Sequence, residues 1–389
     1  MEIEDNQEFA LNDDDRRDVT SVGDEVVPEE DTSTIEIKQP FDPKDIRITT
    51  QTPTVDLLAK RLRNNEIKLN PEFQRSPDIW TPKACSRLIE SMLIRIPLPA
   101  FYFDGHDENT WIVIDGLQRL TTIKEFVVDK SLRLKQLEYL TYLEGLTFDE
   151  LPRQFQRRIE ETQVIAFVVE QGSPADVLFN IFRRLNTGGE TLTLQEIRNA
   201  VNQGSVIAFL KSLAESEEFK AATLGKVNPK RMVDRELVLR FMAFRMKPYS
   251  EYKGTRDLDY FLSETMRQLN RMGGDARDSL GASFRRAMIG ASRLLGSQAF
   301  RKPATEQKMS AISKALFETW AVSLSWLSDD DLELLAGHRV ELWDGYTKLC
   351  SNDDFSKAIS LATGDAKQVH TRFEMVERLI REVLNDIRG

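Results

Sequence analysis

The hydrophobic positions in the first half of the chain switch repeatedly between strand and helix spacing. Short runs rich in Val, Ile and Phe alternate with segments whose apolar residues lie three and four positions apart. Thr54, Thr81 and Thr193 stand where helix caps are expected, and order is expected to begin at Thr54. The pattern predicts strands at 67–69, 100–103, 111–114 and 163–169, the middle two as a hairpin, and helices starting near 54, 81, 117, 148, 173 and 193.

From about residue 205 onward the apolar spacing is helical throughout. The predicted helices cover 206–213, 232–244, 258–269, 279–295, 309–327, 330–350 and 369–387. They share no fixed period, so a bundle is expected rather than a solenoid. The fold class predicted is α+β, with a mixed domain at 46–205 followed by an all-α helical domain at 206–389.

The acidic charge of the chain is concentrated at its start. Residues 1–31 contain thirteen Asp or Glu and two Arg, a net charge of -11, whereas the whole chain carries -10. The other residues therefore sum to +1, which argues neither for nor against nucleic acid as a partner of the folded part. Residues 1–45 have no sustained periodicity and are predicted to be a disordered acidic arm.

Cysteine, histidine and hydropathy restrict the class of protein further. Cys85 and Cys350 are far apart and are expected to be free thiols in a reducing compartment. The three histidines are isolated in sequence, which disfavours a His-based metal site or nuclease. No apolar run approaches the ~18 residues that a membrane helix needs, so we expect a cytoplasmic protein with no membrane partner.

The most informative stretch is 111–123, where a strand of apolar residues ends in Asp115-Gly116 and a helix begins at once. Glycine permits a sharp turn, and the first amides of the new helix lack intrahelical acceptors. A phosphate group would suit such a corner, with Arg119 as an additional donor and Asp115 as an oxygen ligand for Mg²⁺ or an orienting group for water. A plain strand-turn-helix corner explains the same residues equally well.

Two further segments carry polar residues that packing does not fully explain. The first is the loop Phe73-Gln74-Arg75, although an exposed loop arginine usually has no special role. The second runs from Phe182 to Asn199. Capping explains its Thr193 and Glu196, but not the whole segment. Its polar residues could close over a ligand around a glycine-rich corner, and they are Asn186, Glu196, Arg198 and Asn199.

Taken in order, these blocks resemble the N-terminal domain of the GmrSD restriction endonucleases, which is similar in fold to the ParB and sulfiredoxin superfamily. That family's pattern is Pro-x-Phe-Gln-Arg, Pro-x-Pro after a helix, Asp-Gly-Gln-Gln-Arg after a strand, Phe-x-x-x-Asn-x-Gly, and Glu-x-Arg-Asn. The matching residues are Pro71 to Arg75, Pro97 to Pro99, Asp115 to Arg119, Phe182 to Gly188 and Glu196 to Asn199. The resemblance covers about 50–203, and residues 231–241 look like the helical continuation of single-chain members.

The resemblance implies a pocket that binds and hydrolyses a nucleoside triphosphate with Mg²⁺, in defence against foreign or modified DNA. It assigns catalytic roles to Asp115, Gln118 and Arg119, with Asp115 also as the metal ligand. The remaining nucleotide-binding positions that it implies are Arg75, Gly116, Leu117, Asn186, Gly188, Glu196, Arg198 and Asn199.

Two departures from the family pattern qualify these roles. Leu117 stands where the motif has its first Gln, which removes a side-chain donor and makes binding a safer expectation than hydrolysis. The helical half lacks the His-Asn-His pattern of the family's nuclease domain, so the chain resembles a sensing subunit whose partners would be DNA and a separate nuclease or modification subunit.

Two other functions remain open on the sequence. The same corner could belong to a non-catalytic module that binds DNA phosphates or docks a protein. Metal-dependent DNA cleavage by the mixed domain itself is less favoured, because only Asp115, Glu190 and Glu196 are candidate ligands.

Overall fold

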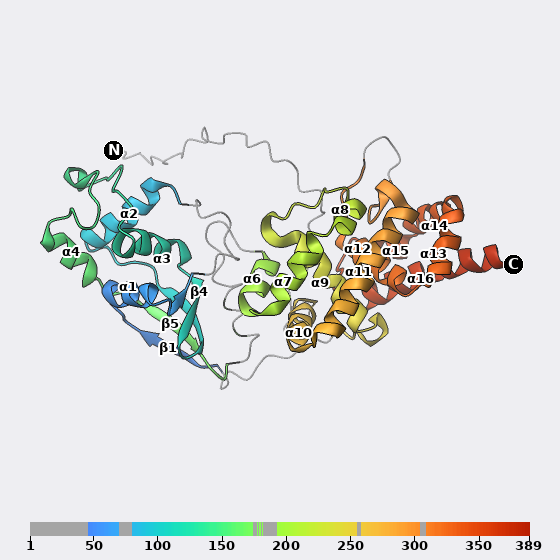
Figure 1. Ribbon diagram of the computed structural model, residues 1–389, viewed down its shortest axis with the longest axis horizontal. Coiled ribbons are helices and arrows are strands. Elements are labelled where there is room, and N and C mark those ends of the chain that lie inside the picture. Colours follow the sequence, from blue (N-terminus) through green and yellow to red (C-terminus); the bar gives the residue numbers. More distant parts are fainter. Residues whose placement is uncertain are drawn as a thin grey trace, which may run out of the picture.

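The computed structural model describes residues 46–69, 80–173, 177, 179, 181, 193–254, 258–303 and 309–389. It shows one mixed sheet with helices and an all-helical C-terminal region, which confirms the predicted α+β class (Figure 1). The acidic arm at 1–45 and most of the helix predicted to begin at 173 lie outside the described residues. No helix in the described ranges has the length and apolar character needed to cross a membrane.

The sheet has five strands in the order β1-β5-β3-β4-β2. β3 and β4 pair antiparallel, which confirms the predicted hairpin, and β1 pairs antiparallel with β5. β5 runs parallel to β3, and β2 runs parallel to β4. The strands are β1 (Ile48–Gln51), β2 (Ile67–Lys68), β3 (Phe101–Asp107), β4 (Thr110–Asp115) and β5 (Ala166–Glu170).

One face of the sheet carries the main hydrophobic core of this half, which we call the sheet core. Phe101, Phe103, Trp111 and Val113 lie at alternate positions along β3 and β4 and are buried in it. The helices that contribute to it are α1 (Val55–Arg63), α2 (Pro82–Leu93), α3 (Leu117–Ile123) and α4 (Arg153–Glu160), which gather beside the sheet in Figure 1.

The local signals at the ends of these helices are the reason they begin where they do. Thr54 and Thr81 each accept a hydrogen bond at 3.3 Å from the backbone N–H three residues later, as predicted, and Pro82 follows Thr81. α3 passes directly into a π-helical turn, Lys124–Val128, so the helical rod continues past Ile123. The rod places Leu120, Ile123 and Val127 in the sheet core, as their spacing predicted.

The other face of the sheet meets α6 (Leu194–Val201). A small hydrophobic cluster, here called the bridging cluster, contains Ile114 and Val169 from the sheet, Phe179, and Ile197 and Ala200 from α6. α6 itself lies beside α7 and α9 in Figure 1. The predicted domain boundary at residue 205 stays a prediction.

The C-terminal region packs around a second and larger core, the helical core. Phe241, Phe284, Phe317 and Trp320 are fully buried in it. Its helices are α7 (Ser205–Ala214), α8 (Glu217–Thr223), α9 (Val233–Met246), α10 (Leu258–Arg271), α11 (Gly274–Leu295), α12 (Lys314–Ser325), α13 (Asp329–Gly337), α14 (Arg339–Cys350), α15 (Asp353–Ala358) and α16 (Ala366–Arg388).

Several predicted boundaries were wrong. Structure begins before Thr54, because β1 pairs with β5, which lies 115 or more residues later in the chain. The four residues of β1 do not by themselves indicate that partner. The strand predicted at 163–169 starts only at Ala166, since Val164 donates instead to the Pro53 carbonyl at 3.0 Å. The single helix predicted at 330–350 is two, because His338 takes a non-helical backbone conformation between α13 and α14.

The predicted helix at 309–327 also begins later than expected. Ile312 forms an isolated antiparallel bridge with Arg301, and α12 starts only after Ser313, whose side chain accepts from the Leu316 N–H. The short helices α8 and α15 were not predicted, because each is too brief to show a helical period.

Candidate functional site

The turn between β4 and α3 depends on a glycine. Gly116 has φ +98°, a left-handed conformation that other residues adopt only with strain, and it caps α3. A β-carbon here would lie 2.4 Å from Cδ1 of Phe101, which is closer than any packing allows. The first bond of the helix runs from the Leu120 N–H to the Gly116 carbonyl at 2.9 Å, so the amides of residues 117–119 precede the helical ladder.

Arg119 is largely buried and its guanidinium is held by groups of the protein. Nη1 donates to the carbonyls of Pro99 and Ala100, the latter at 3.2 Å, and Nη2 donates to Oδ2 of Asp115 at 2.7 Å. The guanidinium carbon lies 4.6 Å from the centre of the Phe101 ring. Arg119 therefore ties the segment before β3 to the end of β4 and holds Asp115 in place.

Asp115 is the exposed member of this pair. Its side chain is 48% exposed, against 11% for Arg119. Within the described residues only Oδ2 has a hydrogen-bond partner. Burial lowers the pKa of Arg119, and the charge of Asp115 opposes that change. An arginine stays protonated at neutral pH, so the corner presents a carboxylate whose charge is balanced from behind.

The two residues between the glycine and the arginine differ in role. Leu117 packs against the sheet core, so the side chain at the position that departs from the family motif is used for packing. Gln118 is half-buried, its carbonyl accepts from Oγ1 of Thr122 at 2.8 Å, and its side-chain amide has no partner in the described part of the chain. Gln118 therefore offers a donor and an acceptor next to Asp115.

The predicted residues Arg75, Asn186 and Gly188 lie outside the described residues, as does Glu190. Their assignment to the pocket stays a prediction. Of the predicted pocket, the structure describes the Asp115–Arg119 corner and the three residues in α6.

Glu196, Arg198 and Asn199 are described, and they are buried. The interactions that the structure gives them run to the helical region. Arg198 donates to Asp259 of α10 and lies 3.9 Å from Glu236 of α9, while Glu196 lies 3.8 Å from Arg231. Besides contacts within α6, these are among the partners that the structure gives their side chains, and their assignment to the pocket stays a prediction.

A preformed metal centre is not part of the described residues, in which no group of three or more His, Cys, Asp or Glu side chains converges. Asp115 stands alone as an exposed carboxylate at the corner. That arrangement suits Mg²⁺, which is usually held by one or two carboxylates together with water and substrate phosphates. It does not suit zinc, which needs three or four protein ligands.

One titratable pair was missed by sequence reasoning. On β3, Nδ1 of His106 lies 2.5 Å from Oδ1 of Asp104, and Nε2 lies 3.2 Å from the Ser173 carbonyl. The hydrogen bond that Nδ1 of His106 donates to the Asp104 carboxylate raises the pKa of His106. The Asp-x-His spacing on a strand was the available signal, since residues i and i+2 lie on one face.

Comparison with known proteins gives one family. Residues 56–202 match the family model described as GmrSD restriction endonuclease, N-terminal domain. No curated protein matches the chain. The matched residues run from the first turn of α1 to the end of α6, so they contain the corner, the bridging cluster and all of the sheet core except Val55.

Proposed function

We propose that this chain is a regulatory component of a DNA-restriction or phage-defence system, because residues 56–202 form a GmrSD restriction endonuclease N-terminal domain. It binds a nucleoside triphosphate with Mg²⁺ at the Asp115–Arg119 corner. A separate nuclease or modification subunit then acts on the DNA. Residues 203–389, which follow the matched domain, are the part of the chain available to meet that subunit.

The observation that supports this proposal is the half-satisfied carboxylate of Asp115. Its side chain is bonded at one oxygen and is 48% exposed. Oδ2 is held at 2.7 Å by a buried arginine whose Nη1 donates to two backbone carbonyls, while Oδ1 has no hydrogen-bond partner in the described residues. Such support orients a group for a ligand.

Each residue of the corner then has a distinct task. Gly116 lets the ligand approach the backbone closely, and the amides of residues 117–119 are free of the helical ladder and suit phosphate oxygens. Gln118 adds a side-chain amide. Asp115 would hold Mg²⁺, which supplies positive charge to the phosphates. Arg119 acts as a positioning residue, since its donors hold Asp115 and the two backbone carbonyls.

The test is calorimetric titration of the full chain with ATP, GTP and CTP in the presence of Mg²⁺. Asp115→Asn keeps the shape of the side chain and removes its charge. We expect it to weaken binding at least about tenfold, a loss in the range of a charge-assisted contact. Asp129→Asn is the matched control, because Asp129 lies at the far end of the same helical rod and pairs with Lys124 on the surface at 2.5 Å.

Equal affinities for the two variants would remove the corner as the binding site. Phosphate release measured in the same samples decides whether the bound triphosphate is hydrolysed, since Leu117 provides no side-chain donor. DNA binding that weakens steeply with salt, without any heat from triphosphates, would favour the non-catalytic module instead.

A further inference from the structure

α6 uses its two sides for different partners. Ile197 and Ala200 belong to the bridging cluster, together with Ile114 and Val169 of the sheet. Its polar residues face the helical region, and Gln195, Glu196, Arg198 and Asn199 are all buried there. A helix of only eight residues thus contributes to both halves of the molecule.

The sheet side of α6 adjoins the candidate site along the chain. Ile114, a member of the bridging cluster, is the residue immediately before Asp115, and it is buried. Because Ile114 and Asp115 are consecutive residues of β4, a backbone shift at Asp115 on ligand binding would also move Ile114. Side chains in a close-packed interior do not move independently, so a shift of Ile114 would also displace Ile197 and Ala200.

The polar side of α6 holds a strained joint. Arg231 and Met232 precede α9 with φ of +69° and +58°, left-handed values at two consecutive residues that are not glycine. Thr193 donates from Oγ1 to the Arg231 carbonyl at 3.1 Å, and Nδ2 of Asn199 lies 2.9 Å from Sδ of Met232. The strained residues are therefore held by α6, and movement of α6 changes what holds them.

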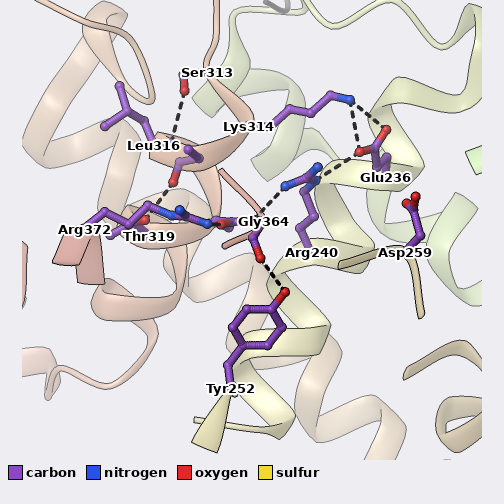
Figure 2. A network of polar contacts seen from close by, with 12 residues as sticks. Glu236, Arg240, Tyr252, Asp259, Ser313, Lys314, Leu316, Thr319, Gly364 and Arg372 are labelled. Carbon is purple, nitrogen blue, oxygen red and sulfur yellow. Dashed lines mark hydrogen bonds and ion pairs between the residues drawn. The ribbon is translucent and has the colours of Figure 1, made fainter. Parts of the chain in front are cut away.

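Beyond this joint lies a network of buried charges. Arg198 contacts Asp259 and approaches Glu236, and Figure 2 shows Lys314 and Arg240 reaching Glu236 from either side. Arg240 continues to Glu318, which also binds Arg372 of α16. Burial alone would raise the pKa of Glu236, but Lys314, Arg240 and Arg198 lower it well below its usual range.

Buried charges of this kind tolerate little change, because each one that loses its partner is left unpaired in a medium of low dielectric. Arg198 is 1% exposed and has no access to water as an alternative partner. The position of α6 is thus linked to the arrangement of α9, α10 and α12 by ion pairs that have to form or break together.

We propose that α6 is the coupling helix of this protein: it joins the Asp115 corner to the helical region through Ile114 on one side and through Arg198 and the Arg231–Met232 joint on the other. The regulatory use of this coupling rests on the proposed nucleotide site. The coupling itself is a property of the ligand-free chain. Glu196, Arg198 and Asn199 thereby act in transmission rather than in the pocket.

Hydrogen exchange measured by mass spectrometry on the full ligand-free chain tests the coupling from the polar side. In Arg198→Gln we expect peptides covering 110–123 to exchange at least about threefold faster than in the wild type, although no contact of Arg198 lies there. Arg372→Gln is the matched control, since Arg372 is equally buried at the other end of the same network. It should speed exchange in α12, α15 and α16 and leave 110–123 unchanged.

An equal effect of both variants on 110–123 would mean general destabilisation, and no effect of Arg198→Gln there would mean that α6 transmits nothing. Either result overturns the proposal. Urea unfolding of both variants checks that they are folded under the conditions of exchange.

The reverse direction uses milder changes, because coupling is reciprocal at equilibrium. Ile114→Val removes one methylene group from the bridging cluster, and Ile123→Val removes the same group from the sheet core. We expect only Ile114→Val to speed exchange at 231–236. If Ile123→Val has the same effect, or if Ile114→Val has none, the coupling is wrong.

A final titration separates this proposal from the proposed function. With Mg²⁺-ATP added, the wild type should gain protection at 231–236 and Arg198→Gln should not. If no triphosphate binds but both exchange effects are present, the nucleotide site is wrong and the coupling stands. If triphosphate binds at the corner and 231–236 does not respond in the wild type, the coupling helix is wrong.

Discussion

The Asp115–Arg119 corner and the Glu196–Asn199 segment of α6 carry the same kinds of side chain, and the structure treats them in opposite ways. Asp115 has one oxygen held by a buried arginine and the other exposed. In α6, by contrast, the polar side chains are buried against α9 and α10. The first arrangement is suited to a ligand, and the second stabilises an interface. Access to water distinguishes the two cases, whereas residue type does not.

The largest expected effect on stability concerns the buried ion pairs of the helical region. Glu318 is fully buried between Arg240 and Arg372. Glu318→Leu would leave two buried guanidinium groups without their carboxylate, so we expect a loss of about 3–5 kcal/mol in the free energy of unfolding. Urea unfolding measures it.

The surface variant Glu333→Gln provides the control. Glu333 also pairs with an arginine, Arg293 at 2.6 Å, but it is 63% exposed. Exposed ion pairs contribute only about 0–1 kcal/mol. If the two variants were equally destabilised, burial would not be what distinguishes the α9–α12 network from the surface pairs.

The second prediction concerns the corner. Gly116→Ala places a methyl group against Phe101 in a left-handed backbone, so we expect a loss of about 2–4 kcal/mol from overpacking and strain together. Gly145→Ala is matched in backbone conformation, with φ +81°, but meets no atom within 4 Å. It should cost only about 1 kcal/mol. Unfolding free energies that did not differ would show that Phe101 moves aside and that the corner is softer than its packing indicates.

The corner could be predicted from sequence because its determinants are local. Gly116 follows the strand directly, and Asp115 and Arg119 lie one helical turn apart, so spacing alone brings them together. The contacts of α6 could not be predicted in the same way. The capping box of Thr193 and Glu196 was found, but Arg198 and Asp259 are 61 residues apart, and no local pattern reveals that pair.

The same reason explains most errors in the predicted fold. The hairpin β3–β4 and the caps of α1 and α2 follow from neighbouring residues. β1 exists because β5 offers a partner across the sheet, and its own four residues are largely exposed and carry little signal. Pairing between segments distant in sequence determined where β1 forms, and sequence periodicity does not indicate such pairing.

A third prediction compares Asp115 with a carboxylate that is fully satisfied. Glu90 is buried and accepts from the N–H groups of residues 138, 139 and 140 at 2.8–2.9 Å. Burial raises the pKa of Glu90, but the three donors lower it more, so the net shift is downward. Its stabilising effect is therefore present above the unfolded-state value near 4.3 and is lost as pH falls through the lower folded-state value.

Glu90→Gln tests this directly. We expect the variant to lose about 1–3 kcal/mol of unfolding free energy at pH 7, because one buried acceptor is replaced by an amide. The difference from the wild type should shrink as the pH falls below about 4. A difference that is constant with pH would show that shape, not charge, holds the loop. Asp115→Asn should change stability less, since Asp115 is half exposed.

The smallest effect on stability is expected at the Asp104–His106 pair, whose side chains are less exposed than Asp115 and more exposed than Glu90. The hydrogen bond that His106 donates to the Asp104 carboxylate raises the pKa of His106, and the side chain of His106 is 32% exposed. Because the folded-state pKa lies above the unfolded value near 6.5, the stabilisation is complete below about pH 6.5 and is lost as the pH rises through the folded-state pKa. Unfolding free energies from pH 5.5 to 9 should therefore decline for the wild type relative to His106→Gln. A parallel pair of curves would mean that the imidazole binds Asp104 equally well in both protonation states. Partial exposure would then be enough to remove the electrostatic advantage that burial gives the ion pairs of Glu236 and Glu318.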